Sequence, residues 1–171
     1  LTKSIEITLE ANPGTFEIEK FAQFREAGIN RLSIGVQSFN NDQLKFLGRI
    51  HSGEEATQAI SEAKKVGFDN INIDLMYGLK AQTIELCMED LMSAINLSPS
   101  HISFYQLTLE PNTLFAKYPP KLPLEKKIWD MGEKGAALLI ENGFRQYEVS
   151  AYGERPSQHN INYWEFGDYI G

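Results

Sequence analysis

Hydrophobic and polar residues alternate in several short stretches of the chain, as they do in β-strands with one buried face. The alternation predicts strands at about residues 4–9, 31–36, 70–76, 101–109 and 146–150. In the first four, one face is apolar and the other is largely polar. The polar positions include Glu6, Thr8, Glu10, Ser33, Gln37, Asn72, Asp74 and Ser103.

Stretches with the apolar spacing of helices separate these strands, and they predict helices at residues 16–27, 54–66, 83–97 and 124–142. Three times the helix ends at a glycine (Gly28, Gly67 or Gly143) that leads through a short loop into the next strand. Strand–helix alternation with short returns predicts an α/β fold with a parallel sheet. The length of the unit fits a (β/α) barrel and a doubly wound sheet alike.

The two faces of the predicted strands differ in polarity, which indicates what lies against each face of the sheet. Helices would cover the apolar face, and a barrel closed around the other face would enclose a polar, hydrogen-bonding interior. A half-exposed antiparallel sheet would show the same alternation and is an alternative, although helices between consecutive strands argue against it.

The composition of the chain excludes several kinds of site and several classes of protein. The chain has 171 residues, a net charge of −7 and a single cysteine, Cys87. One cysteine excludes an internal disulfide, a cysteine-built zinc site and an iron–sulfur cluster held by these residues alone. The charge argues against nucleic-acid binding, and no apolar run approaches the ~18 residues of a membrane span, so we expect a cytoplasmic protein. The strand pattern close to Leu1 suggests part of a longer protein.

Polar residues close four of the predicted strands, namely Glu10, Gln37, Asp74 and either Gln106 or Thr108. Ligands of parallel α/β folds bind at the carboxyl ends of the strands. A carboxylate inside a buried strand, such as that of Asp74, is costly unless it is paired or liganded, but it could also cap a loop. Arg49 adds a cation that suits a carboxylate or phosphate, although an ordinary surface arginine is the alternative.

Four segments carry a family resemblance: Glu10–Pro13, Arg31–Phe39, Leu47–Arg49 and Asn72–Leu79. Together they resemble the oxygen-independent coproporphyrinogen III oxidase family of radical S-adenosylmethionine (SAM) proteins. The resemblance implies a partial radical SAM (β/α) barrel over residues 1–150, with parallel strands and helices on its outer face. Residues 151–171 would begin a C-terminal region.

The resemblance also implies cofactors and site residues. Glu10, Gln37, Arg49 and Asp74 match the family's SAM-contact positions, and Thr108 matches a further one. This agrees with the chemistry of SAM, whose carboxylate suits an arginine and whose ammonium and ribose hydroxyls suit carboxylate or amide acceptors.

Within the family, His159–Trp164 resembles the HNxxYW signature of the HemW-type heme chaperones. That branch implies heme as ligand, His159 as a candidate axial ligand, Tyr163 and Trp164 as aromatic surface, and possible delivery to a heme-acceptor protein. The first alternative is a dehydrogenase that converts coproporphyrinogen III to protoporphyrinogen IX. The second is an unrelated lyase or isomerase barrel that uses Glu10 and Asp74. Whether the protein is an enzyme is left open.

The chain also departs from the family pattern. Lys80-Ala81 stands where the family commonly has a proline before Gln-Thr. The Cys-x3-Cys-x2-Cys loop that holds the family's 4Fe–4S cluster, and a Gly-Gly-Gly-Thr-Pro segment, are not in these residues, so the cluster ligands would lie outside this chain. Cys87 is expected in the core, as are Trp129 and Met131, and His51 and His101 are expected to be structural or solvent-facing.

Overall fold

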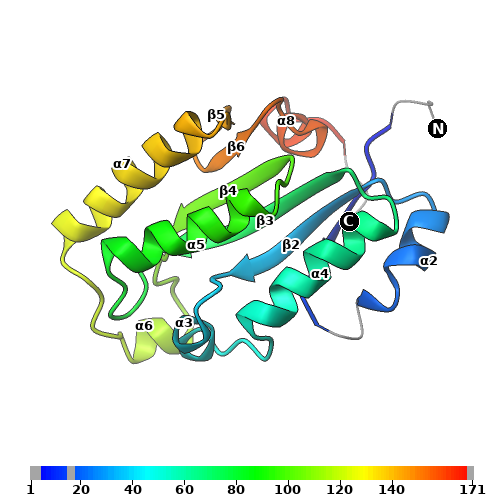
Figure 1. The fold of residues 1–171 in the computed structure, drawn as a ribbon. Helices are drawn as coiled ribbons and strands as arrows, with labels where there is room; N and C mark the ends of the chain where they lie inside the picture. Colours follow the sequence, from blue (N-terminus) through cyan, green and yellow to red (C-terminus); the bar gives the residue numbers. More distant parts are fainter. Residues whose placement is uncertain (1–4, 15–17, 169–171) are drawn as a thin grey trace.

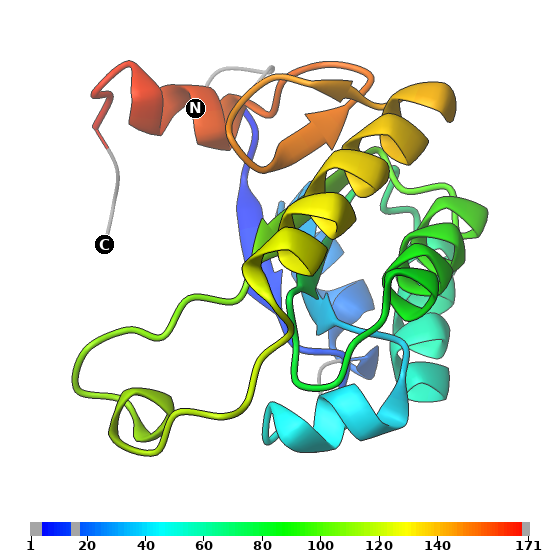
Figure 2. The ribbon, with the colours of Figure 1, turned by 90° about the vertical axis from the view of Figure 1, so that its left-hand side faces the viewer.

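The computed structural model describes residues 5–14 and 18–168, which form one six-stranded sheet with helices packed mainly on one face (Figures 1 and 2). The strand order is β1-β2-β3-β4-β6-β5. The strands are β1 (Thr8–Ala11), β2 (Arg31–Gln37), β3 (Asn70–Tyr77), β4 (His101–Gln106), β5 (Arg145–Gln146) and β6 (Ala151–Gly153). The first four strands are parallel, which confirms the predicted parallel α/β sheet and removes the antiparallel alternative.

Seven helices are described: α2 (Phe21–Glu26), α3 (Asn41–Phe46), α4 (Gly53–Lys65), α5 (Ile84–Asn96), α6 (Leu114–Lys117), α7 (Glu125–Glu141) and α8 (Gln158–Trp164). Helices α4 and α5 lie on one side of the sheet, and α6 and α8 lie on the other (Figure 2). The fully buried apolar strand residues, among them Ile34, Ile73 and Ile102, belong to one hydrophobic core with α4, α5 and α7. Among the described residues no helix is long and apolar enough to cross a membrane.

Helix boundaries follow local signals in the sequence. Ser52 and Glu55 form a reciprocal capping box at the start of α4, and the Thr83 hydroxyl accepts a hydrogen bond from the Leu86 amide at the start of α5. Gly67 ends the α4 unit with a φ of 94°, a left-handed conformation that a side chain would disfavour. These local signals fix the residues at which the helices begin and end, and therefore where the chain returns to the sheet.

The predicted fifth strand at residues 146–150 is wrong in position, because only Gln146 of that range belongs to a strand, β5. The chain reverses after Gln146, and the Tyr147 amide donates to the carbonyl of Ala151 at 3.1 Å. The next residues form β6, which pairs antiparallel with β4 and with β5. A tight reversal needs only local hydrogen bonds, and these outweigh the period-2 pattern that suggested a strand.

Other boundaries also shift. The first strand, expected at 4–9, is Thr8–Ala11, and residue 4 lies outside the described residues. The first helix, expected at 16–27, is described as Phe21–Glu26, and residues 16 and 17 lie outside the described part. The fourth strand ends at Gln106 rather than at residue 109. The helices predicted at 54–66, 83–97 and 124–142 agree with α4, α5 and α7 to within one residue at each end, whereas the short helices α3, α6 and α8 were not predicted.

An irregularity in β2 changes the direction of its last side chain. Ile34 pairs with Ile73 and Gln37 pairs with Leu75, so β2 uses one more residue than β3 over the same interval. Such bulges re-aim side chains near functional sites. Gln37, the last residue of β2, has a φ of 70°, which is uncommon for a residue other than glycine.

Candidate functional site

A cavity of about 550 Å³ lies over the polar face of the parallel strands. It contains Glu10, Gln37, Arg49 and Asp74, the four residues that the family resemblance matched to SAM-contact positions, and also His159. The other lining residues are Ala11, Asn12, Arg31, Ser33, Gly35, Asn72, Ser103, Tyr105 and Asn160. The structure therefore brings residues from four strands, two loops and helix α8 to one volume.

The middle of the cavity wall is a hydrogen-bonded network around Asn72, which is 2 % exposed. Its side-chain nitrogen lies 2.8 Å from a carboxylate oxygen of Asp74 and 2.9 Å from each of the hydroxyl oxygens of Ser33 and Ser103. The hydroxyl of Ser103 also donates to the Asn72 side-chain oxygen at 3.1 Å. Three neighbouring strands thus share one polar network, which satisfies groups that burial would otherwise leave unpaired.

Asp74 is held by this network, and its burial makes its carboxyl group a weaker acid. Burial raises the pKa of its carboxyl above the usual range, and hydrogen bonds from Ser103, Asn72 and Ser33 oppose that rise. The positive charge of Arg31 acts in the same direction as these hydrogen bonds. The Asp74 carboxylate is therefore fixed in orientation, and a cationic or hydroxyl-bearing ligand would stabilise its charged form.

Gln37 is aimed into the cavity by three features. The bulge and left-handed backbone turn the residue, and the hydroxyl of Tyr105 donates a 2.6 Å hydrogen bond to its side-chain oxygen. Gly35 leaves room for the amide, because a Cβ on that glycine would lie 2.9 Å from the Gln37 side-chain nitrogen. Non-glycine residues in a left-handed conformation persist where the surroundings enforce them, and they cluster at ligand sites.

Arg49 reaches the cavity from the loop between α3 and α4. Its Nη1 donates to the side-chain oxygen of Asn12 at 2.9 Å. Asn12 follows β1, so this contact ties the loop after α3 to the mouth of the first strand. Arg49 and Glu10 line the same cavity, and a guanidinium carries five N–H donors, of which this hydrogen bond uses one.

The loop after β2 has its own anchor, Asp90 on α5, which the sequence did not single out. Its carboxylate accepts 2.7 Å hydrogen bonds from the Ser38 hydroxyl and from the Phe39 amide. Burial raises the pKa of Asp90, and these hydrogen bonds oppose the rise. The sequence does contain a signal for a buried acidic residue, because Asp90 lies on the apolar side of an amphipathic helix.

Thr108 lies apart from the other four candidates. It follows the end of β4 and does not line the cavity, and its hydroxyl donates to the Glu110 carboxylate at 2.8 Å. Its assignment as a SAM contact stays a prediction.

His159 reaches the same cavity from the opposite end. It lies on α8, beside the strand starts, whereas Gln37 and Asn12 lie at or beyond the carboxyl ends (Figure 1). Arg31 and Gln37 bound β2 and are six residues apart, which at ~3.3 Å per residue separates the two ends by roughly 20 Å. The His159 ring makes an edge-on contact with Tyr163, with centroids 5.1 Å apart.

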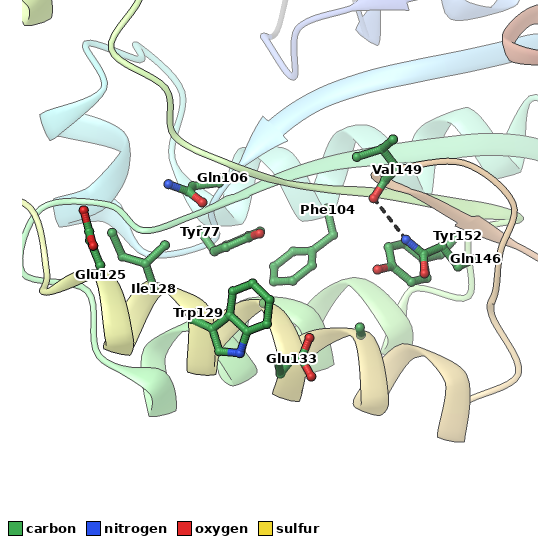
Figure 3. Close-up of a pocket in the computed structure, with 12 residues that line it drawn as sticks. Tyr77, Phe104, Gln106, Glu125, Ile128, Trp129, Glu133, Gln146, Val149 and Tyr152 are labelled. Atoms are coloured by element: carbon green, nitrogen blue, oxygen red, sulfur yellow. Dashed lines mark hydrogen bonds between the residues drawn. The ribbon is translucent and has the colours of Figure 1, made fainter. Parts of the chain in front are cut away.

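A second pocket, of about 470 Å³, lies between α7 and the sheet (Figure 3). Trp129 of α7 lines it together with Tyr77 and Phe104. The prediction that Trp129 belongs to the helix core is wrong, since it is 70 % exposed, whereas Met131 is fully buried as expected. The apolar stripe of α7 is wider than the part of the sheet that it covers, so Trp129 lies at the edge of the buried helix face.

The three remaining candidates are structural. His51 and His101 are both buried, so the solvent-facing option is excluded. Cys87 is buried as expected, and burial raises the pKa of its thiol to about 12, which keeps it protonated. Among the described residues no three His, Cys, Asp or Glu side chains gather as a metal site.

A sequence model of the radical SAM superfamily matches residues 1–91. The chain belongs to the radical SAM superfamily. One end of its polar cavity, around Asn12, Gln37 and Arg49, lies at the carboxyl ends of the strands, where barrels of this superfamily are expected to bind ligands.

Relatives within the superfamily point to one branch. The chain is 56 % identical over 98 % of its length to the "Heme chaperone HemW" of Haemophilus influenzae and 52 % identical over its whole length to that of Escherichia coli. It spans less than half the length of these relatives, 44 % and 46 %. The resemblance to the heme-chaperone branch is confirmed.

A solved structure supports the fold of this radical SAM chain. The coproporphyrinogen III oxidase (HemN) of Escherichia coli, described as a radical SAM enzyme, superposes with a TM-score of 0.82. The match covers 96 % of this chain and 38 % of that one at 27 % identity. It confirms the partial radical SAM fold, and the lyase or isomerase alternative has no support.

Proposed function

We propose that this chain is the central part of a heme chaperone, with SAM bound in the polar cavity and heme bound at His159. The observation that carries the proposal is that Glu10, Gln37, Arg49 and Asp74 line one cavity, while His159 borders it from the other end. The names of the relatives support the heme-chaperone branch.

The donor set of the cavity fits SAM. A cationic guanidinium at Arg49 complements a carboxylate, and Glu10, Asp74 and Gln37 supply acceptors for an ammonium and for ribose hydroxyls. A volume of about 550 Å³ falls within the usual range of ligand sites, roughly 300–1,000 Å³. We also propose Thr108, which follows β4 and does not line the cavity, as a further SAM contact.

The surroundings of His159 fit a flat, apolar ligand. Tyr163 and Trp164 on the same helix are 51 % and 59 % exposed, and Phe166 is 96 % exposed. Imidazole is a common axial ligand of heme iron, and aromatic side chains pack well against a porphyrin plane. Heme would be cargo here, held by residues of this chain for transfer to an acceptor protein.

The chain's own residues would bind and orient SAM and keep water from it. The Asn72 network and the Tyr105–Gln37 hydrogen bond hold the acceptors rigidly, which is the protein's share in positioning a cofactor. A 4Fe–4S cluster held by residues outside this chain would supply an electron to bound SAM. We also propose that residues 151–171 begin the C-terminal region that carries the HNxxYW segment and that the protein is cytoplasmic.

A dehydrogenase acting on coproporphyrinogen III is the second candidate, and the HemN structure, at 27 % identity, supports it more weakly than the HemW relatives support the chaperone. The two functions differ in what they do to a tetrapyrrole. A chaperone binds heme and releases it unchanged, whereas the dehydrogenase oxidises propionate side chains of coproporphyrinogen III to vinyl groups with release of carbon dioxide.

Hemin titration and product analysis of the full-length protein test the proposal. We expect a Soret band that saturates with hemin, and no protoporphyrinogen IX after anaerobic incubation with SAM, a reductant and coproporphyrinogen III. Formation of protoporphyrinogen IX would favour the dehydrogenase, and absence of hemin binding would reject the chaperone.

A further inference from the structure

Glu6 connects the beginning of the chain to α8. One carboxylate oxygen, Oε1, accepts hydrogen bonds from the His159 amide at 2.8 Å and from the Ser157 hydroxyl at 3.1 Å. The other oxygen accepts from the Asn70 side chain at 3.0 Å. These contacts join residues separated by more than 150 positions to the starts of two neighbouring strands.

The contacts of Glu6 are shielded from solvent. Its side chain is 11 % exposed, and Ser157 is fully buried. Arg31, 2 % exposed, places its Nε 4.0 Å from the Glu6 carboxylate, an ion pair without a hydrogen bond. Charge-assisted hydrogen bonds in such surroundings are stronger than those on the surface.

The next residue of the HNxxYW segment is held as well. The Asn160 side chain lies 3.5 Å from the hydroxyl of Tyr147, which in turn lies 3.4 Å from a ring nitrogen of the buried His101. The backbone of His159 and the side chain of Asn160 are therefore anchored to the sheet. Neither Glu6 nor these contacts engage the His159 ring, which borders the cavity.

We propose that Glu6 is the positioning residue of the heme site: by holding Ser157 and the His159 amide, it sets the place and direction from which the His159 imidazole meets heme iron. This inference rests on the proposed heme function. Glu6 does not touch the ligand itself, and it lies at the strand starts, away from the SAM end of the cavity.

The test is hemin titration of the full-length protein with the Glu6→Ala and Glu6→Gln variants, followed by the Soret band. Losing hydrogen bonds to a charged group costs enough to weaken binding roughly tenfold in Glu6→Ala. Glu6→Gln keeps an acceptor for the His159 amide and should fall between Glu6→Ala and the wild type. SAM affinity, measured on the same samples, should stay within about twofold of the wild type.

Three controls keep the proposal falsifiable. Glu26→Ala removes an exposed glutamate and should leave hemin binding unchanged. Should Glu6→Ala fail to fold, Ser157→Ala removes one of the two hydrogen bonds to Oε1, together with the cap that Ser157 provides for the Asn160 amide, and should weaken hemin binding in the same direction. His159→Ala should abolish the histidine-ligated spectrum.

Different results would reject the role of Glu6 and the proposed heme function. Wild-type hemin affinity and spectrum in Glu6→Ala, with the spectrum lost in His159→Ala, would overturn the role of Glu6 and leave the heme function standing. An equal loss of hemin and SAM affinity would mean that Glu6 only stabilises the fold. An unchanged spectrum in His159→Ala would overturn both.

Discussion

The hydroxyl of Tyr105 on β4 donates a 2.6 Å hydrogen bond to the side-chain oxygen of Gln37 at the end of β2, across 68 positions of sequence. The bond spans the intervening strand β3 and fixes an amide whose backbone is left-handed. It links β4 to β2 within the proposed SAM site.

Replacing Tyr105 with Phe should therefore weaken SAM binding. The change removes one neutral hydrogen bond, worth about 1 kcal/mol, and frees the Gln37 side chain. We expect SAM affinity to fall about fivefold in equilibrium binding. Tyr118→Phe removes the hydroxyl of a tyrosine that is 67 % exposed, and it should bind SAM normally. Equal affinities for the two variants would mean that the Tyr105–Gln37 bond does not shape the site.

Gly35→Ala tests the space that the Gln37 amide needs. The new Cβ would lie 2.9 Å from the Gln37 side-chain nitrogen, so the amide must move out of its position. Because that atom ends a flexible side chain, the free energy of unfolding should change by less than about 1 kcal/mol, whereas SAM affinity should fall roughly tenfold. Gly14→Ala, where nothing lies within 4 Å of the new Cβ, is the matched control. A stable Gly35→Ala protein with full affinity would contradict this geometry.

Much of this site was predictable from the sequence. Period-2 alternation placed Ser33, Asn72, Asp74 and Ser103 on one face, and the strand ends placed Glu10 and Gln37 at one mouth, because both patterns reflect local backbone geometry. The direction of β6 was not predictable, since pairing partners are chosen by tertiary contacts and the period is the same for parallel and antiparallel strands.

Long-range hydrogen bonds were equally hidden from the sequence. Nothing local to Asp90 indicates that it holds the Phe39 amide, or that Glu6 reaches His159. The exposure of Trp129 depends on how far the sheet extends beneath α7, which is again a tertiary property.

Asp90→Ala should destabilise the fold. The change leaves the Ser38 hydroxyl and the Phe39 amide without their acceptor, which should lower the free energy of unfolding by about 3 kcal/mol in urea denaturation. Asp90→Asn should cost less, because an amide can accept one of these bonds and burial already disfavours the charge. Glu89→Ala, at an exposed neighbouring position, should change little. Similar losses in Asp90→Ala and Glu89→Ala would contradict the anchoring role.

His101 should make stability depend on pH. Burial lowers the pKa of its imidazole from 6.5 to about 4, so between these values the unfolded chain binds a proton that the folded protein does not. Stability from this group is complete above pH 6.5 and is lost as the pH falls toward 4.

His101→Phe keeps a ring of similar size beside Tyr147 but does not titrate. Urea denaturation at pH 7 and pH 4.5 should show that the variant loses about 2–3 kcal/mol less stability on acidification than the wild type. An identical loss in both proteins would mean that His101 is not buried in its neutral form.

We propose above all that the polar cavity over the parallel strands binds SAM. A crystal structure of the full-length protein with SAM bound tests this proposal most directly. We expect electron density for SAM inside this cavity, with its carboxylate, ammonium or hydroxyl groups within hydrogen-bond distance of at least three of Glu10, Gln37, Arg49 and Asp74. Density for SAM elsewhere, with these four side chains out of contact, would show that the cavity is not the SAM site.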